Sequence, residues 1–215
     1  MVELADLWPT FGLVLSTPRL TLRLPSEVEL TALAELAADG VHGPGERPFL
    51  TPWTEGTAAE RARSVLTGHW YRLSTWEPDS WSLGLAVLHE GTAMGVATLR
   101  ARDFRTNREV TTSSWLGLRF HRQGFGTEAR TALLTLAFDH LGATDATTEV
   151  FRDNAASQGV SRKLGYQPDG ITRDRRGDDV VVSDRLRLTS ERWAALPHRA
   201  PVRVTGLEPA RSMFS

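Results

Sequence analysis

The sequence predicts a fold of the α/β class in which the sheet is mixed, as in α+β proteins. The expected element order is β-α-α-β-β-β-α-β-α-β-β. Three observations predict this class. Apolar residues recur at helical spacing in some segments and at alternate positions in the segments between them. Strand patterns follow one another without an intervening helix between residues 81 and 118, which indicates an antiparallel meander. A glycine-spaced turn then joins the last of these strands directly to a helix.

The first strand and the first two helices have clear signals. Residues 16–25 predict the strand, because apolar and polar residues alternate there until a proline ends the pattern. Ser26 is a good N-cap for a helix that extends to about residue 38. Helical spacing of apolar residues over 58–73 predicts the second helix.

Residues 39–57 form a long irregular loop in this prediction, because they contain four glycines and three prolines. Long loops in compact domains are often functional or mobile. Phe49 and Trp53 lie in this loop, and two interpretations of them are open. They form either an apolar plug or a lid over a substrate site.

The remaining elements complete one domain. The meander is predicted over 81–89, 94–102 and 110–118, followed by a helix over 124–140, a strand over 146–151, a helix over 155–164 and strands over 168–175 and 179–188. We assign residues 14–193 to the domain and residues 1–13 to an N-terminal extension. Residues 194–215 form a C-terminal tail, in which Val202 and Val204 alternate like one more short strand.

Composition narrows the class of protein. The net charge of −1 gives no general attraction to nucleic acid or to an anionic membrane. The absence of cysteine removes disulfides and thiol nucleophiles, and the six histidines show no metal-ligand spacing, so no metal site is expected. No apolar run is long enough to span a membrane, and the start of the chain lacks the features of a signal peptide. We therefore expect a cytoplasmic protein.

The stretch from Trp115 to Ala129 is the most informative part of the chain, because a strand pattern leads through a glycine-spaced turn into a helix. Gly124 and Gly126 let backbone amides approach a ligand, and the first turn of the helix directs unpaired N–H groups at an anion. The run lacks the lysine of a P-loop and the third glycine of a dinucleotide fold. The alternative is a tight turn without a ligand.

Three motifs, taken in order, resemble one family. They are Thr17-Pro-Arg-Leu-Thr-Leu-Arg23, His121-Arg-Gln-Gly-Phe-Gly126, and Asn154-Ala-Ala-Ser157 with Val160 and Lys163-Leu-Gly-Tyr166. The second matches the pattern [Q/R]-x-x-G-x-[G/A] except at its first residue. Together they resemble the GCN5-related N-acyltransferases (GNAT), and within them the RimJ/RimL-like branch. The resemblance implies the GNAT fold, with two splayed central strands.

The resemblance also implies a site for acyl-CoA. Its backbone amides would hold the CoA pyrophosphate and come from Arg122, Gln123, Gly124, Phe125, Gly126 and Thr127. The pantetheine arm would enter between the splayed strands and bond the backbone of Leu116 and Leu118. Asn154 would bond the arm, unless it only caps its helix. Ser157 would protonate the leaving thiolate as the catalytic acid, unless it only faces solvent.

The implied reaction is direct attack of a primary amine on an acetyl-CoA or succinyl-CoA thioester. The acceptor could be a protein N-terminus, a lysine or a small amine, and a homo-oligomer is one arrangement that the tail strand allows. The base is left open among Glu149, Asp174 and Asp184. Many relatives outside the branch have a tyrosine acid where this chain has Ser161, and Tyr166 is interpreted as packing. A catalytically silent acyl-CoA sensor or scaffold is therefore the alternative function.

Overall fold

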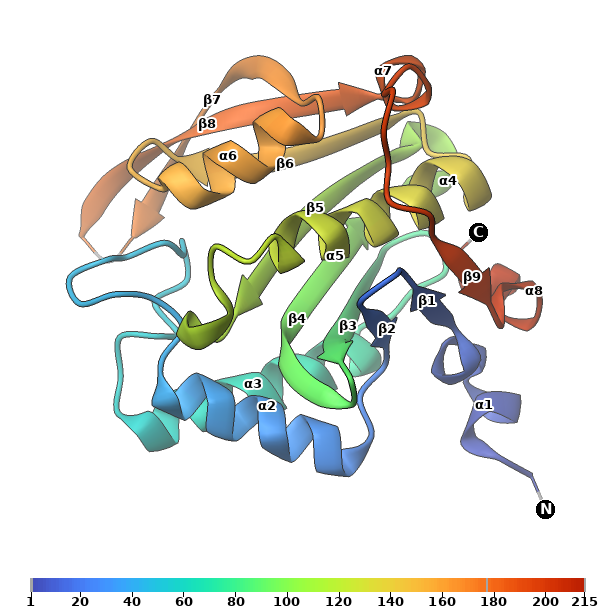
Figure 1. Ribbon diagram of the computed structural model, residues 1–215, viewed down its shortest axis with the longest axis horizontal. Coiled ribbons are helices and arrows are strands. Elements are labelled where there is room, and N and C mark those ends of the chain that lie inside the picture. Colours follow the sequence, from blue (N-terminus) through green and yellow to red (C-terminus); the bar gives the residue numbers. More distant parts are fainter. Residues whose placement is uncertain (1, 177, 215) are drawn as a thin grey trace.

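The computed structural model describes residues 2–176 and 178–214. Over these residues the strands form one nine-stranded sheet in the order β7-β8-β6-β5-β4-β3-β2-β1-β9 (Figure 1). The strands are β1 (Val14–Ser16), β2 (Thr21–Arg23), β3 (Trp81–His89), β4 (Thr92–Ala101), β5 (Glu109–Leu116), β6 (Asp145–Phe151), β7 (Gln167–Arg176), β8 (Asp179–Thr189) and β9 (Arg203–Thr205). Among the described strands only β5 and β6 pair in parallel, which confirms the mixed sheet.

Helices cover both faces of this sheet. They are α1 (Leu4–Leu7), α2 (Glu27–Asp39), α3 (Ala58–Ser74), α4 (Phe104–Asn107), α5 (Phe125–Leu134), α6 (Ala155–Lys163), α7 (Ser190–Ala194) and α8 (Leu207–Ala210), with the short turns η1 (Pro9–Gly12), η2 (Leu118–Phe120), η3 (Thr135–His140) and η4 (Arg211–Met213). The helices α2 and α3 pack on one face, whereas α5 and α6 pack on the other (Figure 1). The predicted helix over 124–140 is therefore confirmed, although its second part, η3, is wound as a π-helix.

Capping explains where the long helices α2 and α3 begin. Ser26 accepts a hydrogen bond from the N–H of Glu29, whose side chain bonds back to the N–H of Ser26. Thr57 and Glu60 make the same reciprocal pair at the start of α3. Each capping box satisfies two amides that would otherwise lack a partner.

Two strand predictions were wrong in their limits. Residues 16–25 do not form one strand, because a turn separates β1 from β2 and its Thr17 N–H donates to the Leu20 carbonyl at 2.9 Å. The predicted end of β5 at Leu118 was also wrong, because the strand stops at Leu116. Leu118 instead starts the 3₁₀ turn η2 and donates its N–H to the carbonyl of Gly40 at 3.2 Å.

Both ends of the chain contribute to the same core. The strand in the tail forms as β9 and pairs with β1 of the same chain. Phe214 is 1% exposed and packs edge-on against Trp76 and Trp81, with ring centroids 5.5 and 4.9 Å away. The indole N–H of Trp76 also donates to the carbonyl of Met213 at 2.8 Å.

The parallel strands β5 and β6 separate soon after they meet. Their pairing covers only residues 109–111 and 145–147. The Thr148 hydroxyl then donates to the Thr112 carbonyl at 3.1 Å, and no further pairing follows in the described residues. The splay predicted for the central strands is thereby confirmed. We call the gap between residues 112–116 and 148–151 the wedge.

Candidate functional site

The turn before α5 presents a row of free backbone amides. Arg122 and Gly124 have φ values of 61° and 84°, which curl the chain into the helix. Within the part of the chain that the structure describes, no N–H from residue 122 to residue 127 donates a hydrogen bond. The first helical bond is donated by Glu128 to the Gly124 carbonyl, at 3.1 Å. The predicted set of amides therefore lies at one helix N-terminus, where the dipole favours an anion.

Gly126 is a glycine that the folded chain itself does not require. Its φ lies outside the left-handed region, and a Cβ there would meet only Leu116 Cδ1, at 3.9 Å. This distance is an ordinary van der Waals contact, so the protein would accommodate an alanine. The open space beside the amides is consequently available to a ligand.

A cluster of contacts fixes the start of α5 to the turn between β1 and β2. Glu128 accepts hydrogen bonds from the Thr17 hydroxyl at 2.7 Å and from the Arg19 Nε at 2.7 Å. Arg19 also donates to the Gln123 carbonyl at 3.1 Å, and its guanidinium lies over the ring of Phe125. Sequence reasoning noticed the Thr17-Pro-Arg motif but not this role, because the partners are far apart along the chain.

The charge of Glu128 is stabilised by this arrangement. Burial raises the pKa of the carboxyl, but hydrogen bonds from Thr17 and Arg19 and the charge of Arg19 more than offset it. The pKa of Glu128 therefore lies below its ordinary value, and the side chain is ionised near neutral pH.

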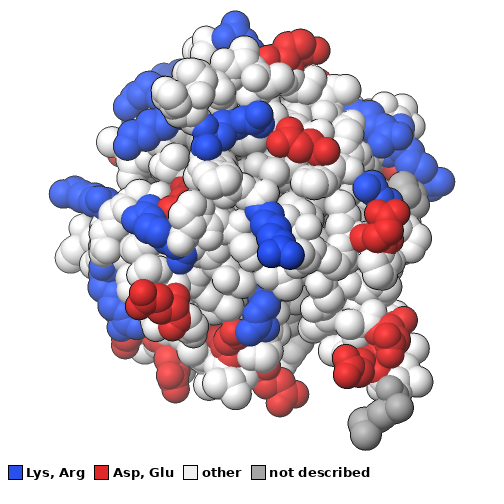
Figure 2. Space-filling view, turned by 45° about the vertical axis from the view of Figure 1, so that its right-hand side comes forward, with Lys and Arg blue, Asp and Glu red and all other residues white. Residues whose placement is uncertain are grey.

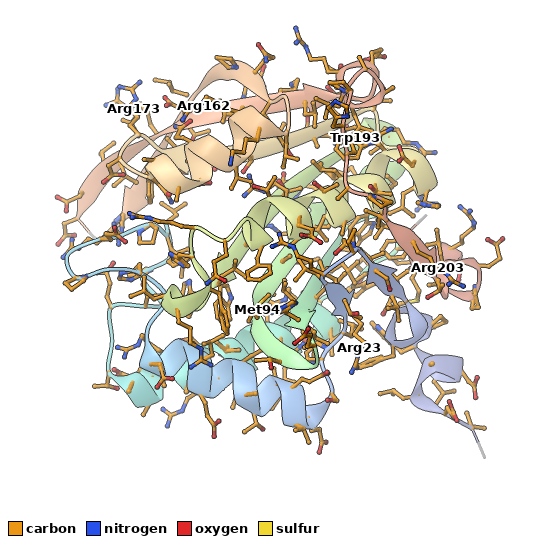
Figure 3. All side chains as sticks on the ribbon, viewed as in Figure 1. Arg23, Met94, Arg162, Arg173, Trp193 and Arg203 are labelled. Atoms are coloured by element: carbon orange, nitrogen blue, oxygen red, sulfur yellow. The ribbon has the colours of Figure 1, made fainter. Side chains whose placement is uncertain are left out.

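The helix α6 brings Asn154 and Ser157 to one end of the site. The Asn154 side chain accepts a hydrogen bond from the Ser157 N–H at 3.0 Å, so it does cap the helix. Ser157 is half-buried. Arg162, on the same helix, is exposed, and it appears in the same upper-left part of the view in Figure 3 as Arg173 of β7.

A buried polar cluster closes the narrow end of the wedge. Arg130 of α5 is 4% exposed and donates to the hydroxyl of Ser161 at 3.0 Å. The hydroxyls of Tyr166 and Thr112 are hydrogen-bonded at 3.1 Å. Burial raises the pKa of Tyr166 despite the nearby charge of Arg130. Tyr166 is thus part of the packed interior, where the sequence placed it.

Of the two residues whose backbone groups were expected to bond a ligand in the wedge, Leu116 and Leu118, only Leu116 lies in β5. Leu118 has both groups occupied, because its N–H bonds Gly40 and its carbonyl accepts from the N–H of His121 at 3.1 Å. The N–H of Gly117 points to β4, where it bonds the Met94 carbonyl. Since backbone groups alternate along a strand, those of Ser114 and Leu116 face the wedge, and the Leu116 carbonyl already contacts Nε2 of His121 at 3.0 Å. Sequence reasoning missed Ser114 by extending the strand too far.

On the opposite face, residues 40–57 cross from α2 to the β7–β8 hairpin, and we call this segment the strap. Its Trp53 packs between Phe49 and Trp115 of β5, with ring centroids 5.2 and 5.5 Å away. Glu55 of the strap forms an ion pair with Arg176 of β7. Phe49 and Trp53 are partly buried against the core under α2 and α3, as the plug interpretation expects.

The three carboxylates considered as bases have different surroundings. Glu149 is exposed. Both oxygens of Asp184 are occupied, by Arg152 and by Gln158, each at 3.1 Å. Asp174 is half-buried, and its Oδ2 is a buried atom without a hydrogen-bond partner.

Three further observations on the described residues concern surface charge, metal binding and membrane crossing. Lys and Arg side chains are interspersed with Asp and Glu on the face shown in Figure 2. Among residues 2–176 and 178–214, no three His, Asp or Glu side chains gather where a metal ion could be shared. In the same ranges, no helix combines the length and apolar character that crossing a bilayer requires.

Comparison with known proteins identifies the architecture. The sequence profile described as "Acetyltransferase (GNAT) domain" matches residues 19–167. A solved structure of RimL, the ribosomal L7/L12 alpha-N-protein acetyltransferase, in complex with coenzyme A superposes with a TM-score of 0.61 at 17% identity, over 80% of this chain and 95% of that one.

Two further solved structures show the same fold. A GCN5-related N-acetyltransferase from Brucella melitensis has a TM-score of 0.66 at 20% identity, over 85% of this chain and 81% of that chain. An acetyltransferase of the GNAT family from Bacillus anthracis has a TM-score of 0.65 at 14% identity, over 83% of this chain and 99% of that chain.

Proposed function

The chain belongs to the acetyltransferase (GNAT) domain family, and we propose that it transfers an acyl group from acyl-CoA to a primary amine. We assign this activity to residues 14–193. The observation that carries the proposal is the row of free amides at the start of α5, which lies beside the unpaired part of β5. An anionic pyrophosphate and an amide-containing arm are the two chemical groups that such a pair of features accommodates.

The donor would be held mainly by main-chain groups. The amides of residues 122–127 would bond the pyrophosphate, and each charge-assisted bond contributes about 1.5–3 kcal/mol. The pantetheine arm would lie in the wedge like an added strand, bonded to Ser114 and Leu116. Asn154 at the mouth of the wedge has donors left for the arm after capping its helix.

The chemistry proposed for the site is direct attack. The amine nitrogen forms a bond to the thioester carbon, the carbon–sulfur bond breaks, and its electron pair leaves with the CoA thiolate. Ser157 would give that thiolate a proton. Holding amine and thioester together accounts for most of the acceleration, because proximity supplies about 7–11 kcal/mol.

Acetyl-CoA is the donor that the family favours, and succinyl-CoA is the second donor we include. RimL is named for acting on the α-amine of a ribosomal protein, and this supports a protein N-terminus as the first acceptor to test. Lysine side chains and small amines complete the acceptor classes.

The proposal is tested by incubating the purified chain with acetyl-CoA or succinyl-CoA and a panel of peptides and small amines. Mass spectrometry should detect an acyl mass increase on at least one amine, together with free CoA. Binding of CoA without transfer to any amine would contradict the enzyme and would instead assign the chain as an acyl-CoA sensor or scaffold.

A further inference from the structure

A guanidinium group lies between the helix α3 and the strand β3, and two glycines leave it room. Arg72 of α3 packs over Gly84 of β3, where an added Cβ would collide with the Arg72 Nε and lie 2.9 Å from its Cζ. A Cβ added to Gly68 of α3 would lie 3.4 Å from Nη1 of the same side chain. Glycine inside a strand often marks such a close approach. The sequence therefore accommodates this guanidinium from both sides.

The folded chain supplies no anion for this guanidinium. Within residues 2–176 and 178–214, Arg72 has no ion-pair partner, and its Nε is a buried atom without a hydrogen-bond acceptor. The charge that acts on Arg72 is a second cation, Arg100 of β4, and burial together with this repulsion lowers the pKa of Arg72 to about 10. A partly buried charge without a partner is costly, so its retention calls for an explanation.

Both cations belong to the face of the sheet that α2 and α3 cover (Figure 1). Ala86 of β3 packs in the core beneath these helices. Side chains alternate along a strand, so Gly84 has the same orientation, and so has its cross-strand partner Thr98 in β4. Arg100 follows two positions after Thr98 on this face. Arg72 is half-buried and Arg100 is exposed, so solvent reaches both side chains.

The carboxylates that β5 and β6 carry on this face do not balance the two cations. Glu109 and Asp145 both form ion pairs with Arg187, at 2.6 and 3.1 Å. Glu149 of β6 is three strands away from β3, or about 14 Å at the usual strand spacing. That separation exceeds the screening length of about 8–10 Å at physiological salt. The face around the two cations is thus left with a positive charge.

One row of paired residues leads from these cations to the wedge. Gly84 pairs with Thr98, and Thr98 pairs with Ser113 of β5. The pairing of β5 with β6 ends at residue 111, so Ser113 lies at the edge of the wedge. Adjacent strands are about 4.8 Å apart, so two spacings place the guanidinium over Gly84 roughly 10 Å from the wedge.

This separation selects the kind of substrate that can reach the guanidinium. A succinyl group carries its carboxylate three carbon–carbon bonds from the thioester carbon, or roughly 4 Å, which is too short. An extended peptide advances about 3.3–3.6 Å per residue, so an acidic side chain on the second to fourth residue spans the gap from a reacting α-amine. The proposed pyrophosphate site lies on the opposite face, at the start of α5, so this row is left to the acceptor.

We propose that Arg72, together with Arg100, binds a carboxylate that the acceptor carries on the second to fourth residue from its reacting α-amine. This inference rests on the proposed function and names the acceptor class, which is peptides with a free α-amine followed closely by an acidic residue. A guanidinium binds a carboxylate through parallel N–H donors, and such pairs are stronger and more directional than neutral hydrogen bonds. Arg72 would be a specificity-determining binding residue and would take no part in the chemistry.

The test compares four variants with the wild type in the full chain, namely Arg72→Gln, Arg72→Lys, Arg100→Gln and Arg63→Gln. Arg63 is an exposed residue of the same helix, so Arg63→Gln is the matched control for the loss of one positive charge. The acceptors are peptides whose only amine is the α-amine, with one aspartate at the second, third or fourth residue. Each peptide has a twin with asparagine in that place, and the donor is acetyl-CoA.

The wild type should acylate the preferred aspartate peptide with a kcat/KM about tenfold above that of its asparagine twin, mainly through a lower KM, because the ion pair forms on binding. Arg72→Gln should abolish this preference and leave the rate with the asparagine peptide unchanged. Arg72→Lys should retain part of the preference, Arg100→Gln should reduce it, and Arg63→Gln should retain all of it. The Kd for acetyl-CoA should stay the same in all four variants.

Equal kcat/KM values for the aspartate and asparagine peptides in the wild type would overturn the inference without any variant. Equal losses with both peptides in a folded Arg72→Gln chain would assign Arg72 a structural role, and a loss confined to succinyl-CoA would place the carboxylate on the donor; either result overturns it. Calorimetry on the wild type saturated with CoA separates the two proposals. Tighter binding of the aspartate peptide than of its twin, without transfer to any amine, would keep the carboxylate site and overturn the proposed function.

Discussion

At the scale of single residues, Ser157 and Ser161 have opposite surroundings on the same side of α6. Ser161 is 0% exposed and accepts a hydrogen bond from the buried Arg130. Ser157 is half-buried at the first turn of the helix, where a ligand in the wedge could reach it. Ser161 therefore supports the fold, and Ser157 is the residue that we propose acts on a substrate.

Replacing Ser157 by alanine should lower kcat more than it changes KM, because a proton donor acts mainly in the transition state. Steady-state kinetics with acetyl-CoA check this. Ser161→Ala is the matched control, and it should lower the melting temperature because the buried Arg130 loses its hydrogen-bond acceptor. A full-rate Ser157→Ala enzyme would remove Ser157 from the role of acid.

The sequence predicted some residues of the site better than others. The amides of residues 122–127 were predictable because glycine spacing and a helix start are local signals. The contacts of Glu128 with Thr17 and Arg19 were not, since they join residues about a hundred positions apart. Leu118 was misplaced because Leu116 and Leu118 continue the alternation, while a tertiary bond to Gly40 ends the strand.

At the scale of elements, local signals set most boundaries and long-range pairing set the rest. The N-cap at Ser26 and the apolar spacing over 58–73 predicted the two helix starts, and the structure shows a capping box at each, at Ser26 and at Thr57. The division of the first strand into β1 and β2 escaped prediction, because β1 has only three residues and shows no period of its own. The π-helical turn η3 also escaped, since apolar spacing does not report which carbonyl each N–H bonds.

The burial of a histidine in α3 predicts that the free energy of unfolding decreases in acid. His69 of α3 is 6% exposed, and burial together with the charge of Arg72 lowers its pKa from 6.5 to about 4. Between pH 4 and pH 6.5, His69 therefore binds a proton more readily in the unfolded chain than in the folded chain. Stability is fully present above pH 6.5 and should fall by about 2–3 kcal/mol as the pH drops to 4.

Urea unfolding at several pH values measures this loss, and His69→Gln should remove that part of the pH dependence because the amide does not titrate. The carboxylates of the protein contribute their own slope, which the variant retains. An unchanged slope between pH 6.5 and 4 in His69→Gln would show that His69 does not carry the effect.

At the scale of the whole molecule, segments from the two ends of the chain pack at one edge of the sheet, and several strands separate this edge from the wedge. The strand β9 extends the sheet beyond β1, whereas β7 forms the opposite edge. The order β7-β8-β6-β5 places the wedge several strands away from this edge (Figure 1), whereas the start of α5 is fixed to the turn between β1 and β2. The wedge is thus separate from the edge at which the chain ends pack.

Phe214→Ala tests this separation. Removing a ring that packs on Trp76 and Trp81 should lower the free energy of unfolding by about 3–5 kcal/mol. The affinity for CoA should remain unchanged well below the melting temperature, because the wedge lies several strands away. Leu7→Ala is a suitable control, since that side chain is 74% exposed. A loss of CoA affinity in the folded Phe214→Ala chain would contradict the separation.

The central claim is that free amides at the start of α5 bind the pyrophosphate of an acyl-CoA, and calorimetry tests it most directly. The wild type should bind acetyl-CoA, and Gly126→Ala should still bind it, because a Cβ there meets only Leu116 Cδ1 at 3.9 Å. Gly126→Trp should abolish binding while the chain stays folded, since the indole would occupy the space of the phosphates. Undiminished acetyl-CoA binding by a folded Gly126→Trp chain, or no binding of any CoA derivative by the wild type, would contradict the account.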